Sequence, residues 1–299
     1  MSLEYKHGAV SIIGGTGTLG YAISSYYAAH RPDITVTIFS RDEHKQSRMK
    51  SLFPNFKYII GDIRNPNSLQ RAVAGRDIVF HVAALKHVDV CEANPEECDL
   101  TNLTGTLNVA KACLVNHVKR VVFSSTDKAV DPINHYGRAK ASAERYLYSY
   151  NKEQSHTKFS IYRWGNVIGS QGSALFGFMD SLVREKKVYL TDPEMTRFWI
   201  PIEWAVRFMM GTITNASTDK AMIPSTMKAA SVLEIVDVLA ELLGITAYDR
   251  IVTGLRPGEK IHEAIYGQWS GEFLASNTQE RYSRDELIEL LSPYVEVYK

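Results

Sequence analysis

The amino-acid sequence predicts an α/β protein built on a doubly wound parallel sheet, with a smaller C-terminal lobe that binds a substrate. One observation is a series of short apolar runs rich in β-branched residues, separated by segments of helical periodicity. Another is a glycine-rich turn directly after the first run. Strands that alternate with helices imply right-handed crossovers, and the resulting parallel sheet binds ligands at the carboxyl ends of its strands.

Apolar runs in the first half of the chain are expected to form the strands of the sheet: 9–13, 35–39, 57–61, 77–83, 120–125 and 158–163. The segments between them are expected to form helices at 18–29, 67–74, 95–116 and 136–152. Asn94 and Pro95 predict the start of one of these helices, because a capping side chain precedes a proline at the first helical position.

The pattern loosens after about residue 165, where glycines and aromatic residues cluster in "RWGNVIGSQGSALFGF". Helices are expected at 202–213 and 231–243, and a capping box from Ser283 to Glu286 opens a final helix. We therefore expect a dinucleotide-binding domain over 1–168 and a mainly substrate-binding lobe over 169–299, with interleaved boundaries. The cleft between them would hold the site.

Composition restricts the classes of function. The chain has 299 residues, 45% of them hydrophobic, which is enough for a sizeable core. Its formal net charge of +1 produces no global field toward nucleic acid or an anionic membrane, so local groups must hold any anionic ligand. The 3 cysteines form neither a disulfide framework nor a zinc-binding pair. No leader or long apolar run is evident, and we expect a cytoplasmic protein without a metal.

The turn "GGTGTLG" has G-x-x-G-x-x-G spacing and leads from the first strand into a helix. Glycines let backbone N–H groups approach a pyrophosphate, and the helix N-terminus adds partial positive charge. A plain glycine turn is the alternative, and the position after the first strand argues against it. The residues expected to contact the cofactor here are Gly14, Thr16, Gly17, Thr18, Leu19 and Gly20.

The end of the second strand discriminates between dinucleotides, because an acid there would bind the ribose 2′-hydroxyl of NAD. Here Ser40 and Arg41 come before the first acid, Asp42, and a hydroxyl with a guanidinium suits the 2′-phosphate of NADP. In the alternative, Arg41 is a solvated surface charge and Asp42 meets the ribose. Asp62 and Ile63 follow the third strand and are placed to touch adenine, although Asp62 could instead cap the next helix.

The stretch "SSTDKAVDPINHYGRAK" concentrates ionisable groups where the fifth strand ends. Tyr136 and Lys140 have the i, i+4 spacing that places both on one helix face. A cation there would lower the pKa of the phenol and hold the nicotinamide ribose, which makes Tyr136 a base for a sugar hydroxyl. The alternative is ordinary helix surface.

Thr126, Asp127 and Lys128 sit at the carboxyl edge of the same strand. Oxidation of a hydroxyl needs only a serine or threonine beside the tyrosine, so an additional acid and base indicate elimination of water. One group would remove the proton alpha to the new ketone and the other would protonate the leaving hydroxyl. Alternatively, Asp127 and Lys128 only pair with each other in a structural turn.

With these residues and several longer motifs, the chain resembles the extended short-chain dehydrogenase/reductases with a Rossmann-type fold. Within them it resembles the soluble, inverting UDP-N-acetylglucosamine 4,6-dehydratases of the polysaccharide biosynthesis family, which begin pseudaminic acid synthesis. The likeness runs from about residue 9 to 266 and includes "FSRDEHKQ", "AALKHVDVCEANPEECDLTN", "RWGNVIGSQGS", "TDPEMTRFWI" and "GLRPGEKIHEAI".

The resemblance implies a lyase reaction with named roles. Tyr136 would help to oxidise C4 as NADP takes the hydride, Lys128 would remove the C5 proton, and Asp127 would protonate the departing 6-hydroxyl. Hydride return to C6 and reprotonation of C5 on the opposite face would give the 4-keto-6-deoxy-L-arabino sugar. The related membrane-anchored, C5-retaining enzymes generally carry methionine at the position of Tyr136, so the tyrosine favours inversion.

The same resemblance implies the surroundings of the site. Lys86 would lie near substrate and cofactor at the end of the fourth strand, after Ala83 and Ala84, and Asn102 would support the active site. The residues expected around the UDP part of a UDP-sugar are Asn166, Arg197, Arg256 and Glu259. Arginines in a cleft suit a pyrophosphate, and surface salt bridges are the alternative. A homo-oligomer formed through the helices at 95–116 and 136–152 is also implied.

Two other functions remain open from the sequence. A UDP-sugar 4-epimerase would use Tyr136 and Lys140 but would not need Asp127 and Lys128. A non-catalytic, NADP-binding redox regulator is a further use of this fold, which fold alone does not exclude. The complete set of four ionisable groups argues against the regulator, because a pure binder has no use for them.

Overall fold

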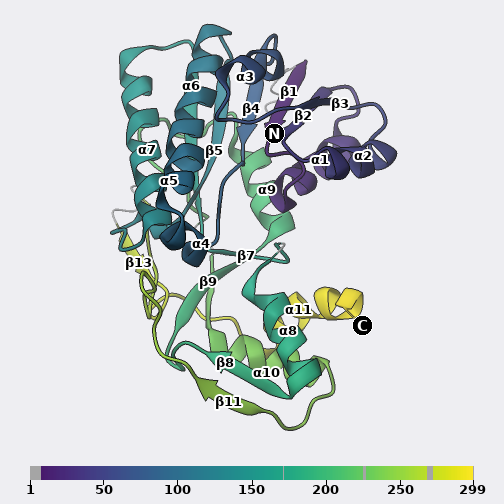
Figure 1. Ribbon diagram of the computed structural model, residues 1–299, viewed down its shortest axis with the longest axis vertical. Helices are drawn as coiled ribbons and strands as arrows, with labels where there is room; N and C mark the ends of the chain where they lie inside the picture. Colours follow the sequence, from purple (N-terminus) through teal and green to yellow (C-terminus); the bar gives the residue numbers. More distant parts are fainter. Residues whose placement is uncertain (1–7, 171, 225–226, 268–271, 299) are drawn as a thin grey trace.

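A six-stranded, fully parallel sheet forms the centre of the computed structural model, which describes residues 8–170, 172–224, 227–267 and 272–298 (Figure 1). Its strand order, β3-β2-β1-β4-β5-β6, confirms the predicted doubly wound fold. Val10 pairs with Val36 on one side and Ile78 on the other. The strands are β1 (Ala9–Ile13), β2 (Thr35–Ser40), β3 (Lys57–Ile60), β4 (Ile78–His81), β5 (Arg120–Thr126) and β6 (Lys158–Trp164).

Helices cover both faces of the sheet. Ile23 of α1 and Met209 of α9 are fully buried on one face, and Leu69 of α3, Val109 of α6 and Leu147 of α7 pack on the other. Burial on both faces explains why the strands are nearly continuous apolar runs. The helices are α1 (Thr18–His30), α2 (Glu43–Leu52), α3 (Pro66–Val73), α6 (Gly105–Val115), α7 (His135–Glu153) and α9 (Ile202–Thr212).

The single helix predicted over 95–116 is wrong in detail. The chain forms α4 (Val88–Ala93), α5 (Pro95–Cys98) and a π-helical turn, η1 (Asp99–Thr104), before α6 begins. The predicted helix start is confirmed, since Asn94 is the N-cap residue of α5 and Pro95 begins the helix, but the Asn94 side chain makes no capping bond and its amide donates to the carbonyl of Val90. Within the π turn, the Asn102 carboxamide bonds both the N–H and the carbonyl of Leu85, at 2.8 Å each. Such wide turns often mark functional sites.

The rest of the chain forms a second group of elements below the six-stranded sheet in Figure 1. It holds α8 (Ala174–Glu185), α10 (Val232–Leu242) and α11 (Arg284–Tyr298), and a separate apolar core forms between them. The predicted capping box is present, with Ser283 and Glu286 bonded reciprocally at the start of α11. Its strands are β7 (Asn166–Ile168), β8 (Lys187–Leu190), β9 (Thr196–Pro201), β10 (Ala229–Ser231), β11 (Asp249–Val252), β12 (Ala264–Gly267) and β13 (Glu272–Ala275).

The two groups interleave along the chain. After β9, α9 returns to pack against α1 at the first core, and Met222 bridges to Tyr162 at the edge of β6. The two groups are therefore tied together by packing as well as by the chain. Within the described ranges, none of the helices combines the length and apolar character needed to cross a bilayer.

Candidate active site

The glycine turn after β1 brings bare backbone to the edge of the sheet. Gly14 has a φ of +88°, and a Cβ at this position would lie 2.6 Å from the backbone nitrogen of Ala83. A Cβ on Gly20 would lie 2.5 Å from the Gly14 carbonyl oxygen. Gly17 is the N-cap of α1 and lacks a side chain. The turn and helix N-terminus therefore fit the pyrophosphate of a dinucleotide, which needs close backbone approach.

A cavity of about 750 Å³ extends from this turn toward the second group of elements. It brings together most residues predicted from the sequence, although they come from distant parts of the chain. The predicted residues that line it are Gly14, Gly17, Thr18, Leu19, Gly20, Ala84, Lys86, Thr126, Lys128, Tyr136, Lys140, Asn166, Arg256 and Glu259. The glycine turn and the ionisable groups after β5 thus face one space.

Other predicted residues do not line this cavity: Thr16, Ser40, Arg41, Asp62, Ile63, Ala83, Asp127 and Arg197. Ser40 is buried, and its hydroxyl accepts a bond of 3.0 Å from the Gln46 amide. Ile63 is also buried and packs closely on Gly105. A Cβ on Gly105 would lie 2.6 Å from Cδ1 of Ile63. Ser40 therefore supports the turn after β2 from within.

The first acidic residue after β2 bonds to the backbone of the helix that follows it. Asp42 caps α2, and its carboxylate accepts from the backbone N–H of Lys45 at 2.9 Å. This bond lowers the pKa of Asp42. Arg41 is exposed and lies 3.7 Å from the carboxylate of Asp62. The guanidinium at the end of β2 thus stays at the surface with one weak ionic partner.

Asp62 does not cap α3, so that alternative is wrong. The N-cap is Asn65, whose side chain accepts from the backbone N–H of Asn67 at 3.0 Å. The carboxylate of Asp62 is instead held by the Arg64 guanidinium, which also reaches Glu97. Arg64 lowers the pKa of Asp62 although partial burial opposes it.

Arg197 is not among the residues that line the cavity. It is buried on β9, and its guanidinium donates to the carbonyl oxygens of Thr196, Ile261 and Lys260 at 2.7–2.9 Å. These donors are therefore directed at the chain segment that precedes β12. Arg197 positions this segment rather than lining the cavity.

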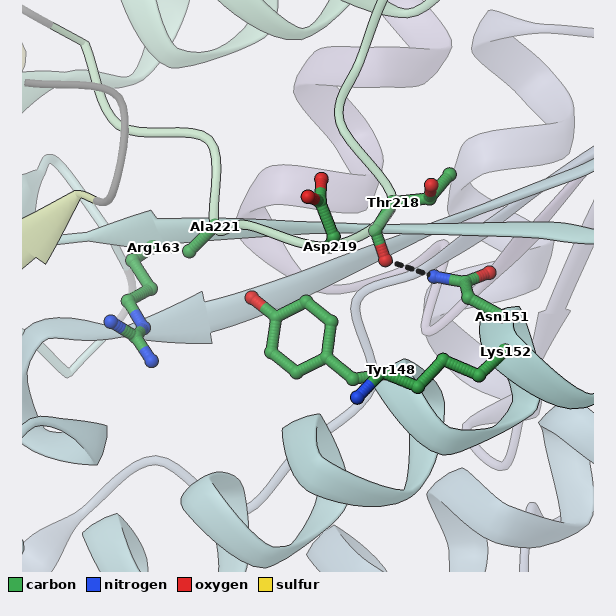
Figure 2. A pocket seen from close by; sticks show the side chains of 7 residues that line it. All are labelled: Tyr148, Asn151, Lys152, Arg163, Thr218, Asp219 and Ala221. Atoms are coloured by element: carbon green, nitrogen blue, oxygen red, sulfur yellow. Dashed lines mark hydrogen bonds between the residues drawn. The ribbon is translucent and has the colours of Figure 1, made fainter.

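Arg163, near the end of β6, is also not among the residues that line the cavity. Its guanidinium pairs with the buried carboxylate of Glu144, which in turn accepts from the Ser125 hydroxyl. Arg163 lines a separate pocket of about 310 Å³ with Tyr148, which projects from α7 toward the loop around 218–221 (Figure 2). This pocket shares no lining residue with the larger cavity.

Tyr136 and Lys140 lie on the buried face of α7, as their spacing predicts. The Lys140 amine donates to the Ser124 carbonyl at 2.8 Å and lies 4.4 Å from the Phe123 ring centre. Burial lowers the pKa of Lys140 to about 8. Burial also raises the pKa of Tyr136 to about 12, against the Lys128 charge and the Thr126 hydroxyl. The net shift at the phenol is therefore opposite to the predicted one.

Asp127 and Lys128 lie in a single 3₁₀ turn, η2 (Asp127–Ala129), directly after β5. Asp127 is fully buried, and its Oδ1 accepts from Thr126 at 3.0 Å and from the Lys128 amine at 3.1 Å. The acid and base do pair, as the alternative interpretation stated. They do not form an isolated pair, however, because a second carboxylate reaches the same amine.

That carboxylate belongs to Glu263, which was missed in the sequence. Its Oε1 lies 3.2 Å from the Lys128 amine, and its side chain is 3% exposed. Glu263 lies inside "GLRPGEKIHEAI", one of the motifs that carry the family resemblance, but the motif by itself assigns no role to this acid. No local pattern places this acid beside Lys128, because the two residues meet only in the folded chain.

Burial and neighbouring charges shift the pKa values of Asp127, Lys128 and Glu263 in different directions. Burial raises the pKa of Asp127, and the negative charge of Glu263 adds to this rise. Burial alone would lower the pKa of Lys128, but Asp127 and Glu263 together raise it. Burial opposes ionisation of Glu263, yet Lys128 and Arg197 hold its pKa below the usual value. Of the two acids, Asp127 is therefore the one that retains a proton more easily.

Hydrogen bonds dock the segment before β12 on the loop after β5. The Asn134 amide donates to the Gly258 carbonyl at 2.9 Å, and the Lys260 amine donates to the Val130 carbonyl at 2.8 Å. The second group of elements thus contributes directly to the surroundings of Lys128.

Comparison with known proteins agrees with the resemblance that the sequence suggested. The family model described as polysaccharide biosynthesis protein matches residues 10–283. An inverting UDP-N-acetylglucosamine 4,6-dehydratase of Campylobacter jejuni is 38% identical over 262 residues, 86% of this chain and 76% of that protein. A UDP-glucose 4-epimerase of Rickettsia felis is 36% identical over 85% of this chain and 76% of that protein.

Solved structures share the fold. The X-ray structure of Pen from Bacillus thuringiensis has a TM-score of 0.88 and 33% identity, with 98% of this chain and 99% of that chain covered. DesIV from Streptomyces venezuelae, a dTDP-glucose 4,6-dehydratase with NAD and TYD bound, has a TM-score of 0.82 and 20% identity over 97% and 96% of the two chains. Since the family match spans both groups of elements and includes all the residues around Lys128, the chain belongs to the polysaccharide biosynthesis protein family.

Proposed function

We propose that this protein is an NADP-dependent nucleotide-sugar 4,6-dehydratase whose substrate is UDP-N-acetylglucosamine. The observation that carries the proposal is the buried Asp127 beside Lys128, next to the cavity that Tyr136 and Lys140 also line. Oxidation at C4 needs only the tyrosine and lysine of α7. An additional buried acid and amine at the same place suit removal of water from C5 and C6.

The glycine turn, Tyr136 and Lys140 would hold the dinucleotide, whose nicotinamide supplies the hydride acceptor and donor when bound. Tyr136 takes the proton from the C4 hydroxyl. Burial raises its pKa to about 12, and the positive charge of Lys128 and the Thr126 hydroxyl act in the opposite direction and so favour its action as a base. Lys140, with a pKa lowered to about 8, can pass the proton onward near neutral pH.

The elimination of water uses Lys128 and Asp127. Lys128 removes the C5 proton, whose acidity the C4 ketone increases, and Asp127 protonates the departing 6-hydroxyl. Return of the hydride to C6 and reprotonation of C5 on the opposite face give the inverted 4-keto-6-deoxy product. Tyr136 supports this outcome through the family resemblance, in which the retaining enzymes generally carry methionine.

The substrate would lie in the part of the cavity nearest the second group of elements. Asn166 and Arg256 line it there, and the Arg256 side chain is exposed. Its guanidinium can bind the pyrophosphate of UDP. Glu259 accepts from the Arg256 backbone at 3.2 Å, and Lys86, which also lines the cavity, donates to Ser170 at 3.2 Å.

A UDP-sugar 4-epimerase is the second candidate, because relatives of that name are 36% identical to this chain. It would use Tyr136 and Lys140 but would leave Asp127 and Lys128 without a catalytic task. A non-catalytic regulator would need none of the four groups.

The test is NMR of the purified protein with UDP-N-acetylglucosamine in deuterated water. We expect a 4-keto-6-deoxy product with deuterium at C5 and inverted C5 geometry. Equilibration with UDP-N-acetylgalactosamine alone would establish the epimerase instead. Retained C5 geometry would keep the dehydratase and contradict the inversion.

Arg41 is the residue that we expect to select NADP. Asp42, which could bind the ribose hydroxyls of NAD, is engaged in capping α2, whereas the Arg41 guanidinium is exposed near the end of β2. Arg41→Ala should weaken NADP binding about 10-fold to 100-fold, the value of one or two charge-assisted hydrogen bonds, and leave NAD binding unchanged. Calorimetric titration with both dinucleotides measures this.

The matched control for Arg41→Ala is Arg48→Ala, which removes the same charge from the exposed side of α2. It should alter neither affinity. Equal weakening of NADP and NAD in Arg41→Ala, or tighter binding of NAD by the unmodified protein, would contradict NADP selection by Arg41.

A homo-oligomer is a further part of the proposal and follows from the resemblance. The helices α6 and α7, which correspond to the predicted dimerisation helices, carry exposed apolar residues: Val115 is 69% exposed and Tyr146 is 49% exposed. Such residues would be covered by a second copy.

A further inference from the structure

The Lys128 amine lies between two carboxylates that come from different parts of the fold. Asp127 Oδ1 is 3.1 Å away on the same 3₁₀ turn, and Glu263 Oε1 is 3.2 Å away on the segment before β12. Asp127 and Glu263 are 0% and 3% exposed, and the Lys128 side chain is 18% exposed. The Lys128 amine therefore contacts one more carboxylate than a one-to-one ion pair needs.

The second oxygens of both acids are buried without a partner in the described ranges: Oδ2 of Asp127 and Oε2 of Glu263. An ionised carboxylate in such a place normally accepts several hydrogen bonds, whereas a protonated one needs fewer acceptor contacts. One of the two acids therefore suits the protonated form.

The neighbouring charges decide which acid this is. Glu263 faces Lys128, Arg197 and Lys260, all of which favour its ionised form. Asp127 faces Lys128, the Thr126 hydroxyl and the Tyr136 phenol, and the negative charge of Glu263 disfavours its ionisation. Glu263 has three cations around it, whereas Asp127 has one.

We propose that Glu263 is a positioning residue of the elimination centre, which serves as the standing counter-ion of Lys128 and so leaves Asp127 free to keep the proton that it delivers to the leaving hydroxyl. This inference rests on the proposed dehydratase function. Without Glu263, Asp127 would be the only carboxylate beside Lys128 and would have to stay ionised.

The protons balance through the step. Lys128 first releases a proton from its partly exposed ammonium to solvent, which leaves a neutral amine beside the ionised Glu263. The amine takes the C5 proton, and Asp127 gives its proton to the 6-hydroxyl, which leaves as water. Solvent then protonates C5 on the opposite face and protonates Asp127. These two protons replace the one that Lys128 released and the C4-hydroxyl proton that leaves through Tyr136 and Lys140, so the resting state is restored.

Glu263→Gln keeps the size of the side chain and removes its charge. Turnover should fall about 10²-fold, as for partial loss of a general acid. Because C4 oxidation does not use Glu263, reduced nicotinamide should accumulate and be visible by its near-ultraviolet absorbance. Asp127 loses its proton as pH rises through its pKa, and the negative charge of Glu263 raises that pKa. In Glu263→Gln the pKa of Asp127 should therefore fall, and the alkaline limb of the pH profile should move to lower pH.

The chain offers a matched control in Lys228, whose amine also lies between two carboxylates, Glu280 at 2.8 Å and Glu286 at 2.7 Å. Glu280 is 65% exposed and remote from the cavity lining. Glu280→Gln should leave turnover and the pH profile unchanged. Glu263→Asp keeps the charge and should recover part of the turnover and the position of the alkaline limb, which a purely structural role would not explain.

A measurement without substrate tests the inference separately from the function. NMR of protein labelled at the aspartate carboxyls follows the titration of Asp127, which Asp127→Asn identifies. We expect Asp127 to titrate above the other aspartates and to move down in folded, dinucleotide-binding Glu263→Gln. An unchanged titration would overturn the inference even if dehydration is observed. If the unmodified protein yields no dehydration product but the titration moves as expected, only the proposed function fails.

Discussion

Lys128→Met is expected to reduce dehydration about 10²-fold to 10⁴-fold, the usual range for a general acid or base, while dinucleotide binding is retained. Of Asp127 and Lys128, only the Lys128 amine can accept the C5 proton. Dinucleotide binding should be retained because the glycine turn follows a different strand, β1. Methionine preserves the length of the side chain. Oxidation at C4 should be slower, because the Lys128 charge no longer lowers the pKa of Tyr136, but elimination should be slowed far more. Reduced nicotinamide should therefore accumulate after mixing with substrate in single-turnover absorbance measurements.

The substitution also leaves Asp127 and Glu263 buried without their shared cation. Breaking a buried pair in this way typically costs about 3–5 kcal/mol, less any relief from protonation of the acids. Denaturant unfolding should show this loss. Adding Glu263→Gln to Lys128→Met should restore part of the stability but none of the turnover, which separates folding from catalysis. Full turnover in folded Lys128→Met would remove Lys128 from the mechanism.

Tyr136→Phe is expected to block the reaction one step earlier. The phenol, which lines the cavity, is the group that we propose takes the C4 proton, and its loss should reduce turnover about 10²-fold to 10⁴-fold. In contrast to Lys128→Met, no reduced nicotinamide should appear, because C4 oxidation itself fails. The same absorbance measurement distinguishes the two variants.

Tyr148→Phe is the matched control on the same helix. Tyr148 points into the separate pocket of Figure 2 and does not line the larger cavity, so its substitution should leave turnover unchanged. If Tyr136→Phe accumulated reduced nicotinamide as Lys128→Met does, the tyrosine would act in elimination and the assignment of the two steps would be wrong.

Local patterns were sufficient for the sheet and most helices. The six strands follow from apolar runs, because a strand buried on both faces must be apolar throughout. The alignment of Tyr136 and Lys140 on one face follows from helix geometry, and the capping box of Ser283 and Glu286 follows from chemistry over three residues. The regular helix predicted over 95–116 is wrong at Asp99–Thr104, where the Asn102 side chain bonds the backbone of Leu85, a contact that local periodicity does not indicate.

The sequence by itself determined the fold class, the dinucleotide turn and the ionisable stretch after β5, because each depends on neighbours within a few residues. Only the tertiary structure placed Glu263 beside Lys128, turned Arg197 toward the carbonyls before β12, and buried the Ser40 hydroxyl against Gln46. Burial and Coulomb interactions depend on distance in space, so the pKa values of Asp127 and Lys128 depend on burial and on Glu263, a residue far away along the chain.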